Sequence, residues 1–97
     1  MAKNDKEIAS RQSNNHNISS LEWSNHGDRI LTSAYDNIAR VWSLQGKLEG
    51  VFRAKPQIIV STWNKNDSLV ASAGDDNSIY IWNPSSIADD AMFIINQ

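Results

Sequence analysis

The chain of 97 residues contains no cysteine, which excludes disulfide frameworks, thiolate zinc sites and cysteine nucleophiles. It has only four glycines, and they form no glycine-rich phosphate-binding loop. Neither sign of charge dominates, because nine Lys and Arg residues stand against eleven Asp and Glu residues, for a net charge of −2. A protein dedicated to nucleic acid or to a membrane surface would show a basic excess or stripe. We therefore expect no direct nucleic-acid or membrane partner.

Long apolar runs are also missing. No segment approaches the roughly 18 apolar residues that span a bilayer, and the N-terminus lacks the apolar core of a secretory signal. The two histidines, His16 and His26, stand at the edges of expected loops, and we interpret both as solvated. The acidic pairs Asp75–Asp76 and Asp89–Asp90 lack further ligands at calcium-loop spacing. We expect no metal, no cofactor and, without a nucleophile beside a base, no enzymatic activity.

The sequence repeats itself with an offset of 40 residues and no gap. Trp23 aligns with Trp63, and three later residues align in the same way: Asp36, Asn37 and Trp42 with Asp76, Asn77 and Trp82. A period of about 40–45 residues that ends in Trp is the sequence signature of four-stranded β-propeller blades. Two tryptophans and an Asp-Asn turn that align at one offset indicate a true repeat and not a chance match.

Runs rich in Ile, Val, Trp and Tyr mark the strands of each repeat. We expect strands at residues 18–23, 30–34, 38–42 and 47–52, and again at 58–63, 69–73, 78–82 and 91–95, with residues 83–90 as a connector. The prediction is an all-β fold of two four-stranded antiparallel blades, a partial propeller. Residues 1–17 form a polar flexible tail, residues 18–53 the first blade and residues 54–97 the second. The inner strands are apolar on both faces, which calls for neighbouring blades.

Short motifs within the repeats resemble the WD-repeat family. The resemblance rests on residues 20–23, 33–36, 39–42 and 46–48 of the first unit and on residues 63–65, 72–76 and 81–82 of the second. Within that family the chain is most similar to the transducin β-like corepressor subunits, over about residues 14 to 83. The resemblance implies a nuclear scaffold in a histone-deacetylase corepressor complex.

The same resemblance implies a buried hydrogen-bond network in each blade, running from Trp through a hydroxyl and a His to an Asp. By motif position the members are Thr32, Asp36 and Trp42 in the first blade and Ser72, Asp76 and Trp82 in the second. The histidines depart from the pattern. His16 lies two residues nearer the first strand than the family position, and the second repeat has Ala54 or Lys55 there. Lys55 could pair with Asp76, or Asp76 could cap its own turn.

Partners of a propeller usually meet the face formed by the loops that enter the first strand and the loops between the second and third. Four residues of this chain fall there: Asn17, Tyr35, Gln57 and Asp75. Tyr suits an interface because its ring is apolar while its hydroxyl still forms hydrogen bonds, although Tyr35 could equally be an incidental surface aromatic. We interpret Arg40 as a strand residue whose stem covers apolar surface.

The predicted function is a non-enzymatic protein-interaction scaffold from a nuclear corepressor subunit. The alternatives are a WD-repeat adaptor of another pathway, such as ubiquitin ligation or RNA processing, and an incomplete gene product without a binding function, because fold does not fix the partner. Repeats of this kind need about three copies or more for stability. We therefore expect the chain to associate with itself or with further blades, and three or four copies could close a ring.

Overall fold

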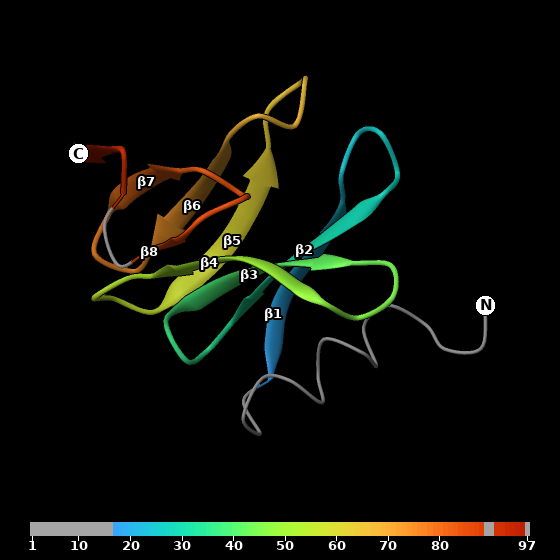
Figure 1. The fold of residues 1–97 in the computed structure, drawn as a ribbon. Helices are drawn as coiled ribbons and strands as arrows, with labels where there is room; N and C mark the ends of the chain where they lie inside the picture. Colours follow the sequence, from blue (N-terminus) through green and yellow to red (C-terminus); the bar gives the residue numbers. More distant parts are fainter. Residues whose placement is uncertain (1–16, 89–90, 97) are drawn as a thin grey trace.

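A computed structural model describes residues 17–88 and 91–96 of the chain. The described residues form nine β-strands in two sheets, which pack against each other as Figure 1 shows. The expected tail, apart from Asn17, lies outside the described residues. No helix in the described ranges has the length and apolar character needed to cross a membrane.

The first sheet is an antiparallel meander in chain order, drawn in blue to green in Figure 1. Its strands are β1 (Ile18–Trp23), β2 (Arg29–Ala34), β3 (Ile38–Ser43) and β4 (Leu48–Arg53). The second sheet repeats this arrangement with β5 (Ile58–Trp63), β6 (Val70–Gly74), β7 (Ser78–Trp82) and β9 (Phe93–Asn96). The predicted bounds of β1, β5 and β7 match the structure, and the other predicted strands differ by one or two residues at their ends.

The segment between β7 and β9 contains a strand that the sequence analysis did not predict. β8 (Ile87–Ala88) leaves its own repeat and pairs in parallel with β4, so that the first sheet has five strands. The N–H of Val51 donates to the carbonyl of Ser86 at 2.9 Å. Gly50 permits this approach, because a Cβ atom there would overlap the carbonyl oxygen of Pro84. The expectation of a plain connector over residues 83–90 was therefore wrong at Ile87 and Ala88.

Two of the tight turns use asparagine in the left-handed region. Asn37 has φ of 59° and Asn77, its equivalent in the second repeat, has φ of 67°. Asparagine tolerates this conformation better than most residues with a side chain. The aligned Asp-Asn pairs therefore predicted the β2–β3 and β6–β7 turns for a physical reason.

The main core lies between the two sheets. The first sheet contributes Leu31, Ala39, Val41 and Phe52, and the second contributes Ile58, Trp63, Val70, Tyr80 and Trp82. The ring of Phe52 lies 5.5 Å from that of Tyr80 and 5.7 Å from that of Trp82, with the last pair stacked. Burial of each such side chain contributes about 1.5–3 kcal/mol, so this interface holds the two sheets together.

The outer parts of the second sheet carry exposed apolar side chains. Phe93, Ile94 and Ile95 of β9 are more than half exposed, and Ile59 and Val60 of β5 are about half exposed. Clusters of exposed apolar side chains mark an interaction site or an aggregation hazard. The apolar strand pattern predicted this uncovered surface.

Candidate interaction site and the networks behind it

In the first sheet, the indole of Trp42 is anchored as the motif implied. Its Nε1 donates to the Thr32 hydroxyl at 3.0 Å, and both side chains are buried. Asp36 instead meets Arg40, whose Nη2 donates to the carboxylate at 2.8 Å. The two side chains are only 8% and 7% exposed, so this is a buried ion pair. Arg40 lies on a strand as predicted, but its ion pair with Asp36 was not predicted. His16 lies outside the described residues.

In the second sheet, a chain of serines continues from the buried tryptophan. Trp82 Nε1 donates to Ser72 Oγ at 2.9 Å, and Ser72 Oγ lies 2.7 Å from Ser61 Oγ. Ser61 Oγ in turn lies 2.5 Å from Ser33 Oγ in the first sheet. Because an indole N–H can only donate, the Ser72 hydroxyl accepts a hydrogen bond from it. The same hydroxyl can donate its own hydrogen bond to Ser61 Oγ. Three hydroxyls thus form a polar link across the sheet interface.

Asp76 caps its own turn, which was one of the two alternatives. It accepts the N–H of Ser78 at 3.0 Å and the hydroxyl of Tyr80 at 2.8 Å. The Tyr80 hydrogen bond, with smaller help from Ser78, lowers the pKa of Asp76 from its usual value. Burial, followed by the hydrogen bond to Asp76, raises the pKa of Tyr80. No ion pair joins Lys55 to Asp76 in the described ranges.

Arg40 and Tyr80 occupy the same position in the two repeats, 40 residues apart. Each lies four residues after its turn aspartate and donates to it at 2.8 Å. They hold the aspartates that the family pattern would join to histidines. Because Arg and Tyr are chemically different, residue identity at the 40-residue offset gave no signal of this shared role.

The four residues expected to bind partners lie at one end of the sheets. Tyr35 N donates to Asn17 O at 3.1 Å, and Asp75 N donates to Gln57 O at 3.0 Å. The side chain of Gln57 then donates to the carbonyl of Tyr35 at 3.3 Å, which joins the two pairs. All four residues are exposed. The structure therefore brings Asn17, Tyr35, Gln57 and Asp75 together into one surface.

At the other end of the sheets, Asp67 connects the two repeats in a way that the sequence analysis missed. Its carboxylate accepts hydrogen bonds from the N–H of Asn25 at 2.8 Å, the Asn25 amide at 2.8 Å and the N–H of His26 at 3.0 Å. His26 Nδ1 lies 2.6 Å from the same carboxylate, although the imidazole is 69% exposed. His26 is therefore a solvated residue, as expected, that also contacts the neighbouring repeat.

The hydrogen-bond donors around Asp67 determine the pKa of its carboxyl group. Burial alone would raise the pKa of Asp67, but the N–H of Asn25 and the other donors outweigh it and hold the pKa well below its usual range. Asp67 has φ of 62°, in the position where the first repeat has Gly27 at φ 75°. An aspartate aligned with a turn glycine was the signal in the sequence that could have singled it out.

Two further residues of the first repeat reach the second. Glu22 accepts the hydroxyl of Thr62 at 3.0 Å and the N–H of Trp63 at 2.9 Å. The guanidinium of Arg29 lies 4.8 Å from the ring centroid of Trp63 and donates to the Asp67 carbonyl at 3.2 Å. These contacts fix the orientation of the two sheets, and hence the surface at each end.

The family profile described as "WD domain, G-beta repeat" matches residues 6–43 and 46–83. The chain belongs to the WD-repeat family. Domains of this family are typically non-catalytic scaffolds. Among the described residues of this WD-repeat chain, no group of three or more His, Cys, Asp and Glu residues could hold a metal ion.

Individual curated proteins are similar to the chain over most of its length. It is 35% identical over 69 residues to "F-box-like/WD repeat-containing protein TBL1X" of Mus musculus, a match that covers 70% of this chain and 13% of that protein. It is 31% identical over 74 residues to "Autophagy-related protein 16" of Arabidopsis thaliana, covering 70% of this chain and 14% of that protein. The chain therefore spans a small part of the relatives that it matches.

A solved structure shows the same fold. The crystal structure of Hsv2 from "Kluyvelomyces marxianus" superposes with a TM-score of 0.74 at 18% sequence identity. The match covers 89% of this chain and 31% of the Hsv2 chain. The all-β prediction of two antiparallel blades is confirmed.

Proposed function

We propose that the chain is a non-catalytic scaffold that binds other proteins and that it works in a nuclear transcriptional corepressor complex. The observation that carries the binding role is the exposed surface of Asn17, Tyr35, Gln57 and Asp75, which both repeats build jointly. Hydrogen bonds between backbone groups and from the Gln57 side chain fix this surface, while Tyr35 is 49% exposed and available to a partner. Aromatic rings presented on a rigid base are favoured anchors of protein interfaces.

The corepressor assignment is supported by the similarity to the TBL1X protein, whose subfamily the sequence motifs also resemble. An epitope-tagged chain expressed in cells should locate to the nucleus and co-precipitate histone-deacetylase complex subunits. The matched control is the double variant Tyr35→Ala/Asp75→Ala, which changes exposed side chains and leaves the backbone contacts of this surface in place. If the double variant captures as much of these subunits as the wild type, this surface is not the binding site. If the wild-type chain captures no corepressor subunit, the corepressor assignment is refuted.

The second candidate is a WD-repeat adaptor in another pathway. It is supported by the 31% identity to autophagy-related protein 16 and by 26% identity over 65 residues to "Ribosome biogenesis protein YTM1" of Candida glabrata. The same precipitation separates the candidates, because ubiquitin-ligation or RNA-processing components would replace the deacetylase subunits. A chain that captures nothing would match an incomplete gene product without a binding function.

A further inference from the structure

The turn between β7 and β8 holds an exposed serine in a fixed position. The side chain of Asn83 accepts the N–H of Ser85 at 2.8 Å, and the Asn83 carbonyl accepts the N–H of Ser86 at 3.2 Å. Pro84, between them, is buried. The carbonyl of Ser86 accepts the N–H of Val51, in the first sheet, at 2.9 Å. The backbone of the turn is therefore fixed on both sides of Ser85, whose side chain remains on the surface.

The guanidinium of Arg29, at the start of β2, lies beside the Ser85 hydroxyl. Its Nη1 donates to Ser85 Oγ at 3.5 Å, which is at the long end of hydrogen-bond distances. Its Nη2 donates to the carbonyl of Asp67 at 3.2 Å, and the guanidinium carbon lies 4.8 Å from the ring centroid of Trp63. The neutral hydroxyl is thus a weak partner for a cation that other contacts already position.

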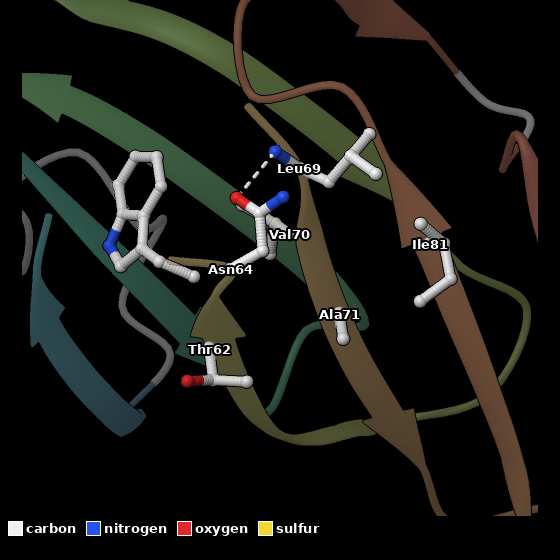
Figure 2. Close-up of a pocket in the computed structure, with 7 residues that line it drawn as sticks. Thr62, Asn64, Leu69, Val70, Ala71 and Ile81 are labelled. Atoms are coloured by element: carbon white, nitrogen blue, oxygen red, sulfur yellow. Dashed lines mark hydrogen bonds between the residues drawn. The ribbon is translucent and has the colours of Figure 1, made fainter. Parts of the chain in front are cut away.

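The groups that position Arg29 are themselves fixed in the second repeat. Asp67 lies in the β5–β6 turn, where the N–H of Asn64 donates to the carbonyl of Leu69 and the N–H of Leu69 donates to Asn64 Oδ1, both at 3.0 Å (Figure 2). Trp63, just before this turn, is only 7% exposed. Each terminal nitrogen of a guanidinium carries its own hydrogens. Arg29 can therefore keep its Nη2 bond to the turn and still bind a stronger acceptor with Nη1.

A phosphoryl group on Ser85 would be such an acceptor. Phosphoserine carries close to two negative charges at neutral pH and three strong acceptor oxygens. Arginine suits this group, because its planar donors match phosphate oxygens and its charge strengthens each hydrogen bond. The phosphoryl oxygens also extend beyond Oγ, so they can close the long distance between Ser85 and Nη1.

We propose that Ser85 is a phosphorylation site and that Arg29 binds the resulting phosphoserine. A protein kinase would transfer the γ-phosphoryl group of ATP to Ser85 Oγ, with ADP as the leaving group and the hydroxyl proton released. Arg29 belongs to the first repeat and Ser85 to the second, so the phosphate would join the two repeats. It would also hold β8, which begins two residues later, against β4. Neither residue belongs to the proposed binding surface, so the phosphate acts at a separate site.

The binding of the phosphate is tested with phosphoserine incorporated at position 85 during translation, which requires no kinase. It should raise the melting temperature, followed by circular dichroism, by about 4–8 °C. In an Arg29→Gln background the same phosphoserine should give no increase. Each comparison is made within one background, so the loss of the Arg29 contact with Trp63 cancels. An equal increase in both backgrounds, or a decrease in the wild-type background, would overturn the proposal.

Ser86 provides the matched control, because its hydroxyl is one residue away and donates to the carbonyl of Asn83 at 3.0 Å instead. Phosphoserine at position 86 should give no increase that depends on Arg29. Phosphoserine at position 85 should also slow hydrogen exchange of the Val51 N–H about fivefold, since that group is bonded to the segment that the phosphate holds. Equal behaviour of the two positions, or unchanged exchange at Val51, would refute the role of Arg29.

Whether the modification occurs is tested by mass spectrometry of the tagged chain recovered from cells. Phosphate should be found on Ser85, and the corresponding signal should be missing from the Ser85→Ala variant. Phosphate on Ser86 instead, or on neither serine, would show that Ser85 is not a phosphorylation site.

Discussion

Replacing Trp82 with alanine should remove most of the stability of the chain. Trp82 is 2% exposed, stacks on Phe52 across the sheet interface and donates to Ser72 at 2.9 Å. Truncating a buried tryptophan costs about 3–5 kcal/mol, against total stabilities of about 5–15 kcal/mol for ordinary domains. Trp42 is equally buried but belongs to a smaller cluster with Ile30, so Trp42→Ala should also destabilise strongly and somewhat less than Trp82→Ala.

The matched control is Trp82→Phe, which keeps a ring beside Phe52 and removes the indole donor. Ser72 retains Ser61 as a partner, so the loss should be about 1–2 kcal/mol. Each kcal/mol corresponds to about 4–8 °C in melting temperature for a domain of this size. Urea and thermal unfolding followed by circular dichroism measure both variants. If Trp82→Ala has the same melting temperature as the wild type, the assignment of this residue to the interface between the two sheets is refuted.

Three further outcomes follow from the contacts described. Arg40→Ala should cost about 3–5 kcal/mol in urea unfolding, because it leaves the Asp36 carboxylate buried and unpaired; a change below 1 kcal/mol would contradict the ion pair. The pKa of Asp67 is lower in the folded chain than the unfolded value of about 3.9, so its stabilisation is complete above about pH 5 and is lost as the pH falls through the folded pKa. The stability difference between wild type and Asp67→Asn should therefore shrink on acidification, and a constant difference would count against the charged contact. Tyr35→Ala/Asp75→Ala should weaken partner binding without shifting the melting temperature, and a lower melting temperature would show a structural role instead.

The 40-residue offset was sufficient to predict the blades, because strand and turn preferences are local. The Asp-Asn turns and the runs that end in Trp42 and Trp82 each carry their own conformational signal. β8 could not be predicted in this way, since a strand of two residues has no periodicity and its partner β4 lies far away in the sequence. Its pairing depends on Gly50, whose role is visible only when the Pro84 carbonyl is placed beside it.

The tryptophan hydrogen bonds within each repeat were predicted, whereas several contacts between the two repeats were missed. The bonds of Trp42 and Trp82 to hydroxyls ten residues earlier lie within single sheets. The serine link through Ser61 and the Asp67 contact join different sheets, so they depend on how the sheets stack. The Arg40 ion pair was missed because a long cationic side chain on a strand usually reaches solvent, whereas here its turn aspartate is buried with it.

The mass of the purified chain in solution tests the central claim most directly. The claim is that this is a pair of WD blades whose outer faces need a further partner, because exposed Phe93, Ile95 and Val60 leave apolar surface uncovered. Light scattering coupled to size exclusion should give a mass above that of the 10.9 kDa monomer, or aggregation, in the absence of a partner. A monomeric mass together with a single cooperative unfolding transition would contradict the account.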